Sequence, residues 1–210
     1  MAKFLTDEAE RSIEAAIAAI EAVSSAEVMV AIRPRARFAL AQHAVVGFVT
    51  GLGMLGFALH SHYAFTRWQV LLLPLFAGIA GAMLVEACPP LYRWLAPFWL
   101  RNEHVREAAY ATFVERAVHA TRDRTGMLVY VALRERMVEI VADVGVVKHH
   151  GIEVLAAWAG TLEARIADGP EAFAKELAAL APELAKTLPL RVPDPDELAN
   201  DIHVVRARPS

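Results

Sequence analysis

Hydrophobic and polar positions are unevenly distributed along the chain, and one long apolar stretch stands out. Residues 39–100 contain three charged side chains, which are Arg67, Glu86 and Arg93. Within this stretch, residues 39–59 and 68–88 are each long enough to cross the roughly 30 Å hydrocarbon core of a bilayer as a helix. The polar and aromatic segment 60–67 joins them as a turn. The pattern predicts a two-helix transmembrane hairpin; the alternative is a pair of buried core helices, which the rest of the chain could hardly surround.

The segment before the hairpin has the pattern of one helix and one strand. Thr6, followed by acidic residues, is typical of a helix start. Apolar residues then recur at the helical spacing i, i+3, i+4, i+7, at Ile13, Ala16, Ile17 and Ile20. We expect a helix over residues 7–23 and a strand over the β-rich residues 27–32.

The segment after the hairpin alternates between helical and strand patterns. Residues 102–121 predict an amphipathic helix with Val105, Ala109, Phe113 and Ala117 on one face. Residues 127–133 and 137–142 predict two strands that form an antiparallel hairpin, because only a tight connection separates them. Residues 152–166 predict a further helix. Phe173, Leu177, Leu180 and Leu184 mark another, which begins at Asp168-Gly-Pro170 and ends before Pro189.

Together these elements predict an α/β fold, a small sandwich with the membrane hairpin inserted after its first strand. The first strand would return through a helix to a neighbour in the same sheet. Residues 1–38 and 101–187 are then two parts of one domain, interrupted by the hairpin and an interfacial segment in residues 39–100. That interfacial segment covers residues 89–99, where prolines and tryptophans alternate with apolar residues. Residues 188–210 form a polar tail, rich in Pro and Asp and partly ordered.

Composition excludes several classes of protein. The chain has 210 residues, of which 56% are hydrophobic, and a formal net charge of −3. This hydrophobicity excludes disorder, and a single cysteine, Cys88, excludes a disulfide framework. The charge balance argues against a nucleic-acid partner, since the basic residues cluster only at Arg33, Arg35 and Arg37. The expected partners are the lipid bilayer and either another membrane protein or a second copy of the chain.

The distribution of arginine predicts an orientation in the membrane. Five arginines flank the hairpin and one, Arg67, lies in its turn; the flanking ones are Arg33, Arg35, Arg37, Arg93 and Arg101. Because positive residues favour the cytoplasmic side, both termini are expected in the cytoplasm. Acidic residues at positions 7 and 8 stand where a signal peptide would have its apolar core. We therefore expect an integral protein of the cytoplasmic membrane.

Small residues recur within both predicted spans at a spacing of four. They are Gly47 and Gly51 in the first span, and Gly78 and Ala82 in the second. Small side chains let helix backbones approach closely in a membrane. They are expected to pack the hairpin on itself, and a dimer interface is the alternative.

Several segments outside the hairpin resemble the TPM domain family. They are Leu5-Thr-Asp-Glu with its helix, Ala26-Glu-Val-Met-Val-Ala-Ile32, Arg124-Thr-Gly-Met-Leu-Val-Tyr-Val-Ala-Leu133 and Arg136-Met-Val-Glu-Ile-Val-Ala-Asp143. With the last two helices they cover about 120 residues, counted on the printed sequence. The resemblance implies an α/β/α sandwich with a short mixed sheet, in membrane-associated proteins of mostly unknown activity. Some members of that family resemble acid phosphatases and some bind calcium.

Four polar residues stand at the ends of two predicted strands. Asp123 precedes one strand, and Asp143, His149 and His150 follow the next. In an antiparallel hairpin these positions share one rim of the sheet. Carboxylates favour calcium or magnesium and imidazoles favour zinc, so one interpretation is a divalent-cation site. The other is structural: Asp123 caps a turn, Asp143 forms an Asx turn beside Gly145, and the histidines are solvated on a loop.

A fifth polar residue, Glu139, lies inside an apolar strand. We expect it to pair with Arg134 or Arg136 across the strands, or to face a groove.

Two hypotheses for function follow. The first is a membrane-anchored TPM-like domain that acts as a non-enzymatic interaction or assembly module at the cytoplasmic face. The alternative is a metal-dependent phosphate-ester hydrolase, like the family members that resemble acid phosphatases, with Asp123, Asp143 and the two histidines as its site. No activated nucleophile or phosphate-binding loop is recognisable in the sequence, which favours the first.

Overall fold

The computed structural model describes residues 4, 6–34, 40–87, 98–190 and 203–204. The chain divides into two compact units. Met1–Arg37 and Asn102–Ser210 form the first unit, and Phe38–Arg101 forms the second. The first unit is therefore interrupted in sequence by the second.

A mixed sheet forms the centre of the first unit. Its order is β3-β2-β1-β4, with β1 (Glu27–Arg33) parallel to β2 (Gly126–Ala132) and β2 antiparallel to β3 (Met137–Ala142). Parallel neighbours need a long crossover connection, and here the crossover contains a helix, α5 (Phe98–Glu115). The structure thus confirms a mixed α/β fold, the antiparallel pair and the return through a helix.

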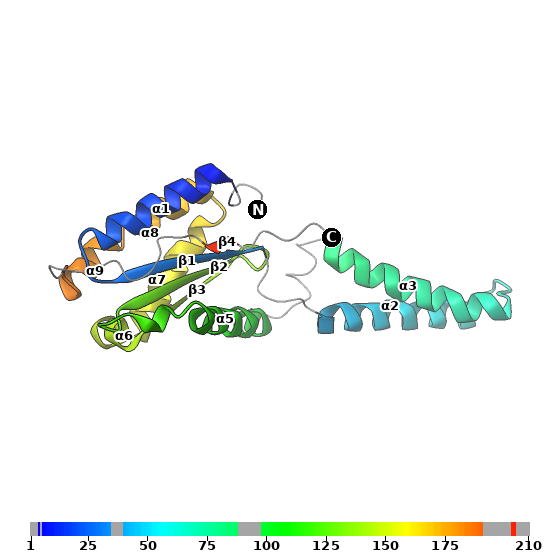
Figure 1. Ribbon diagram of the computed structural model, residues 1–210. Helices are drawn as coiled ribbons and strands as arrows, with labels where there is room; N and C mark the ends of the chain where they lie inside the picture. The colour runs from blue at the N-terminus through cyan, green and yellow to red at the C-terminus, as the bar shows by residue number, and fades with distance from the viewer. Residues whose placement is uncertain (1–3, 5, 35–39, 88–97, 191–202, 205–210) are drawn as a thin grey trace. The chain divides into compact units, whose positions relative to one another are not determined.

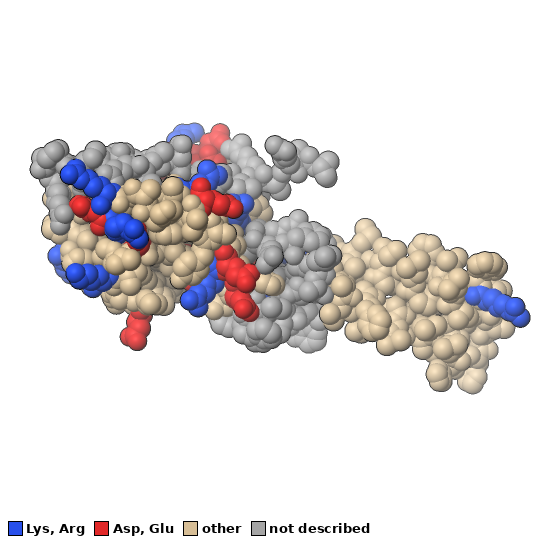
Figure 2. All heavy atoms as spheres, turned by 60° about the horizontal axis from the view of Figure 1, so that its bottom comes forward, with Lys and Arg blue, Asp and Glu red and all other residues tan. Residues whose placement is uncertain are grey.

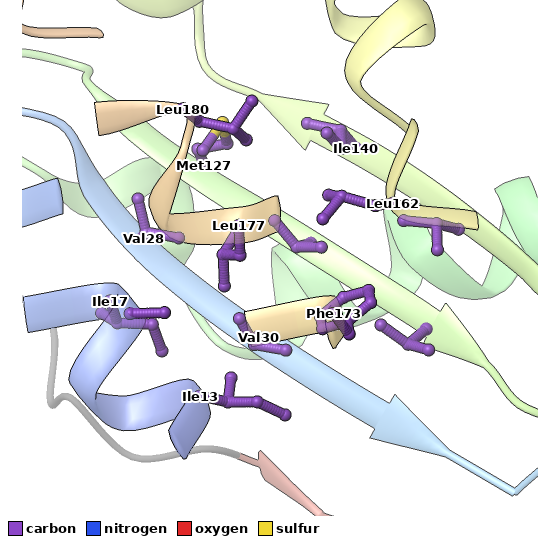
Figure 3. Packing of buried hydrophobic residues seen from close by; sticks show 14 of the residues in the cluster. Ile13, Ile17, Val28, Val30, Met127, Ile140, Leu162, Phe173, Leu177 and Leu180 are labelled. Atoms are coloured by element: carbon purple, nitrogen blue, oxygen red, sulfur yellow. The ribbon is translucent and has the colours of Figure 1, made fainter. Parts of the chain in front are cut away.

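One face of the sheet is covered by α1 (Asp7–Glu21), α7 (Ile152–Arg165) and α8 (Pro170–Ala178), as Figure 1 shows. Thr6 caps α1, since its Oγ1 accepts the Ala9 N–H at 3.3 Å. The predicted apolar stripe of α1 is buried, and Figure 3 shows Ile13 and Ile17 pointing into the same core as Phe173 and Leu177 of α8. The periodicity of the sequence therefore identified the core face of α1 correctly.

The opposite face carries α5 (Figure 1). Val105, Ala109 and Phe113 are buried there among strand residues such as Leu128 and Tyr130. The prediction that this helix continues to residue 121 is wrong. Ala117 is exposed and adopts a left-handed φ of 53°, so the helix ends at Glu115 and a short 3-10 turn, η2 (Val118–Ala120), follows.

The second unit contains the two long apolar helices that the hydrophobic pattern predicts. They are α2 (Leu40–His60) and α3 (Arg67–Ala87), and Pro74 lies inside α3. Both are long and apolar enough to cross a membrane. The expected interfacial segment lies outside the described residues, apart from Phe98 and Trp99, which begin α5.

Two local predictions after β3 are corrected by the structure. The segment expected to be a loop with two solvated histidines forms α6 (Val144–His150), whose first backbone N–H is accepted by Asp143 Oδ1 at 2.6 Å. The single helix expected between Pro170 and Pro189 is two helices, α8 and α9 (Ala181–Thr187), because the chain turns before Pro182, which lies in the first turn of α9.

The segment expected to be a polar tail contributes to the fold at both of its described parts. Leu188 is buried and its carbonyl accepts the Ser25 N–H at 3.0 Å. Farther along, β4 (His203–Val204) pairs parallel to β1 and adds a fourth strand. Residues 191–202 and 205–210 lie outside the described residues.

Candidate functional site

The most extensive unusual surface belongs to the α2–α3 hairpin, whose outward side chains are large, apolar and exposed. Phe48 is 71% exposed and Trp68 is 72% exposed, and both helices carry further residues of this kind. Only 6% of each 18-residue apolar window, His43–His60 and Arg67–Leu84, is buried. Figure 2 shows this surface without charge except for a basic side chain near one end. The alternative of two buried core helices therefore does not fit the described residues.

Glycines line the contact between α2 and α3. A methyl group added at Gly47 would lie 2.9 Å from the Gly78 carbonyl oxygen, and one added at Gly51 would lie 2.9 Å from the Pro74 carbonyl oxygen. Ala82 also faces this contact, because its Cβ would lie 3.5 Å from the added methyl of Gly47. The four small residues singled out in the sequence thus lie where the two helix backbones approach each other.

A threonine adds polar contacts to the same seam. Thr50 Oγ1 lies 2.8 Å from the Val46 carbonyl oxygen in its own helix and 3.3 Å from the Ala77 carbonyl oxygen of α3. A methyl group at Gly81 would overlap the Thr50 side chain. Interhelical hydrogen bonds of this kind stabilise helix pairs in a bilayer by up to about 1–2 kcal/mol.

The candidate metal-binding residues lie near one rim of the sheet, where Met127 of β2 is opposite Ala142 of β3. Asp143 is 4% exposed, caps α6 and forms an ion pair with Arg124 at 2.7 Å. Asp123 is exposed on the turn before β2, and His149 is exposed on α6. Within the part of the chain that the structure describes, no three His, Cys, Asp or Glu side chains are placed to hold a metal ion. The hypothesis of a cation site receives no geometric support there.

His150 has a structural environment of its own. Its Nε2 lies 2.7 Å from Thr187 Oγ1 of α9, and its ring contacts the Trp158 ring of α7 at 4.8 Å between centroids. Burial lowers the pKa of His150 from the usual 6.5, and the neighbouring His149 lowers it further, while Glu183 opposes the shift. The residue therefore joins α6, α7 and α9 in its neutral form.

A polar groove lies between α5 and the sheet. Its volume is about 420 Å³, and its lining is Arg33, Glu107, Ala108, Ala111, Thr112, Glu115 and Tyr130. Arg33 ends β1, and Tyr130 lies opposite Ala31 in the parallel β1–β2 register. Three elements of the first unit, β1, β2 and α5, thus build this groove.

Burial controls the ionisation of the groove tyrosine. It raises the pKa of Tyr130 to about 12, with Arg33 opposing the shift and Glu135 adding to it. The phenol is therefore neutral at physiological pH and offers an uncharged hydroxyl.

Glu139 lies in the same row of the sheet, opposite Tyr130 on β3. Burial raises the pKa of Glu139, and Arg106 of α5 opposes the shift. The expected cross-strand partners were Arg134 and Arg136, whereas the basic group that acts on this carboxyl is Arg106 of α5, the helix packed on this face of the sheet. Arg106 of α5 thus acts on Glu139 of β3. Glu107 and Glu115 of the same helix instead line the groove beside β1 and β2.

Sequence reasoning did not identify this groove, although its signal was present. Met29, Ala31 and Arg33 alternate along β1 and point to the α5 face, so an arginine at the end of that series is placed beside the helix. The contribution of Tyr130 depends on the parallel register of β1 with β2, which the sequence pattern did not supply.

Comparison with known proteins yields a likeness in fold. No protein-family model and no curated protein matches the chain. Among solved structures, the chain is similar to the NMR structure of the BA42 protein from the psychrophilic bacterium Bizionia argentinensis. The two share 17% sequence identity and a TM-score of 0.57, and the match covers 96% of this chain and 95% of that chain. At this identity the likeness concerns the fold alone.

Proposed function

We propose that the chain is a membrane-anchored, TPM-like α/β/α protein in which α2 and α3 form a transmembrane hairpin. The exposed apolar surface of the hairpin carries the proposal. Among the residues of α2 and α3 whose side chains the structure describes, fourteen large hydrophobic ones are exposed. At roughly 1 kcal/mol or more for each such side chain, leaving them in water costs on the order of 10–20 kcal/mol, comparable to the whole stability of a small domain. A bilayer removes this cost.

The first unit acts at the cytoplasmic face in this proposal. The arginine count supports that orientation, with five arginines flanking the hairpin and Arg67 alone in its turn. The function of the unit is to bind and assemble a partner, which is another membrane protein or a second copy of the chain. Two hydrophobic core clusters, with no group of three metal-ligating side chains among the described residues, support binding rather than catalysis.

Anchoring and orientation are tested with single-cysteine variants of the full chain. In a Cys88→Ser background, His62→Cys marks the hairpin turn and Glu8→Cys marks the exposed surface of α1. The protein is expected to stay in the membrane pellet after carbonate extraction. A membrane-impermeant maleimide should label His62→Cys in intact cells and Glu8→Cys only after lysis. Release by carbonate refutes the anchor, and the reverse labelling pattern refutes the orientation.

The non-enzymatic role needs a separate test. The full chain, purified in detergent, should neither hydrolyse p-nitrophenyl phosphate nor gain that activity with calcium, magnesium or zinc. Crosslinking in intact membranes should trap the chain in a defined complex. Metal-dependent turnover that Asp143→Asn abolishes would replace this proposal with the hydrolase.

A further inference from the structure

The groove between α5 and the β1–β2 pair is built from residues of the first unit alone. Its volume of about 420 Å³ lies in the range of small-molecule pockets. Arg33, which lines the groove, is the last residue of β1, and β2 runs parallel to that strand. Ligands of open α/β sheets commonly bind at the carboxyl ends of parallel strands. The size of the groove and its place in the sheet are therefore those of a ligand site.

Arg33 brings an unused hydrogen-bond donor to this groove. Its Nε atom is buried and has no hydrogen-bond partner among the described residues. Two nearby carboxylates, Glu107 of the groove and Glu135 after β2, have partners of their own, and neither supplies an acceptor to this Nε. A buried donor without an acceptor is unfavourable, so a ligand oxygen that accepts from it recovers free energy. The guanidinium edge that contains Nε is suited to a carboxylate, which accepts two parallel hydrogen bonds.

The phenol of Tyr130 provides a second donor close to Arg33. In the parallel register Arg33 is opposite Ala132, which is two residues from Tyr130 along β2. The strand spacing and the rise per residue place the Cα atoms of Arg33 and Tyr130 about 8 Å apart, within reach of two long side chains. Burial raises the pKa of Tyr130 to about 12, and the positive charge of Arg33 opposes this shift. The hydroxyl therefore keeps its proton and can donate it to a ligand oxygen.

The α5 side of the groove limits the charge and the shape of the ligand. Ala108 and Ala111 line the groove with small apolar side chains. Glu115 follows Ala111 by one helical turn, lines the same groove and is exposed. A second negative charge on the ligand would be repelled by this carboxylate. A ligand with one carboxylate and a short apolar body fits this lining best.

We infer that this groove binds a small monocarboxylate whose oxygens accept hydrogen bonds from Arg33 Nε and from the Tyr130 hydroxyl. The ligand belongs to the class of short aliphatic or aromatic acids, represented by butyrate and benzoate. This binding site is additional to the anchoring and assembly role proposed above. It lies within the first unit and requires no particular position of the hairpin.

Titration of the unmodified full chain in detergent micelles tests the charge of the ligand. Butyrate labelled with carbon-13 at its carboxyl carbon is followed by NMR and should bind saturably, with a Kd on the order of 1 mM. Unlabelled butyramide has nearly the same shape but no charge, so it should compete at least tenfold more weakly. Succinate adds a second carboxylate and should also compete more weakly than unlabelled butyrate, because Glu115 lines the groove.

Variants of the full chain test the two donors. Arg33→Gln should weaken butyrate binding at least tenfold. Arg33→Lys keeps the positive charge but lacks the planar fork, so it should remain severalfold weaker than the unmodified protein. Tyr130→Phe removes the hydroxyl alone and should weaken binding severalfold. Arg106→Gln is the matched control, since this arginine acts on Glu139 and does not line the groove, and it should leave binding unchanged.

Absence of saturable butyrate and benzoate binding up to about 50 mM overturns the inference. Equal competition by butyramide also overturns it, and that comparison needs no variant that could fail to fold. Equal affinity in Arg33→Gln, with an unchanged thermal melt, excludes this groove as the site. None of these results depends on carbonate extraction or cysteine labelling, so failure of this site and failure of the membrane anchor are separately visible.

Discussion

The glycine seam of the hairpin allows two chemically identical substitutions to be compared in one helix. Gly47→Ala places a methyl group 2.9 Å from the Gly78 carbonyl oxygen, whereas Gly53→Ala meets nothing within 4 Å. Both changes replace a helical glycine by alanine, which favours the helix by roughly 1 kcal/mol in water. The difference between the two variants therefore isolates the cost of separating α2 from α3.

The magnitude of that difference follows from the contact distance. A methyl carbon packs against oxygen at about 3.4 Å or more, so Gly47→Ala must shift two helix backbones by several tenths of an ångström. Overpacking of this kind costs roughly 1–3 kcal/mol. Gly53→Ala should be as stable as the unmodified protein or slightly more stable, and Gly47→Ala should be less stable than Gly53→Ala by about 1–3 kcal/mol.

The assay is reversible unfolding of the full chain from mild detergent into sodium dodecyl sulfate. A donor dye at the start of α2 and an acceptor dye at the end of α3 report the separation of the two helices. Two unfolding curves that coincide for Gly47→Ala and Gly53→Ala would refute the conclusion that this seam holds the hairpin together. A loss of stability confined to Gly53→Ala would instead place a contact on the face that the structure leaves open.

Three further predictions concern the first unit. Gly126→Ala places a methyl group against the Val118 carbonyl oxygen and should lower the free energy of unfolding by about 3 kcal/mol or more, whereas Gly160→Ala, which meets nothing within 4 Å, should be neutral or stabilising in the same chemical denaturation. Because the pKa of His150 is lowered in the folded state, folding favours its neutral form: its contribution is fully present above pH 6.5 and is lost as the pH falls below 6.5 toward the lower folded value. The drop in thermal midpoint between pH 8 and pH 5 should therefore be smaller in His150→Gln, and an unchanged drop would contradict this account. Asp143→Ala removes the cap of α6 and should cost about 1–2 kcal/mol in chemical denaturation, with little added by the ion pair to a largely exposed arginine; a cost below about 0.5 kcal/mol would contradict the capping role.

The periodicity of hydrophobic residues in the sequence was sufficient to predict the long helices. The stripe of α1 and the two apolar helices have enough residues for a pattern to repeat, and the structure places helices there. The seven residues of α6 allow fewer than two full turns, so no period was visible and its histidines were assigned to a loop. Pro182 marked the break between α8 and α9, but its role at a helix start was missed.

Pairing between distant segments was harder to predict than local structure. β4 has two residues, and its place beside β1 depends on partners far away in the sequence. The groove has the same origin, because Arg33 and Tyr130 become neighbours only through the parallel register. For the candidate cation site, the sequence correctly placed the residues near one rim of the sheet but not their contacts. Asp143 caps α6 and pairs with Arg124, whereas His150 contacts Thr187 of α9.

The interruption of the sheet by the hairpin has a consequence for the order in which the chain folds. β1 leaves the ribosome before α2, and its partner β2 begins only at Gly126, so the central pair cannot form until the whole hairpin has been synthesised. Its other neighbour, β4, follows β2 and β3 in the chain and is synthesised later still. Contacts between such distant segments are slow to form because loop closure must come first. During this interval β1 has both edges unpaired, so synthesis stalled between α3 and β2 should leave an aggregation-prone strand exposed.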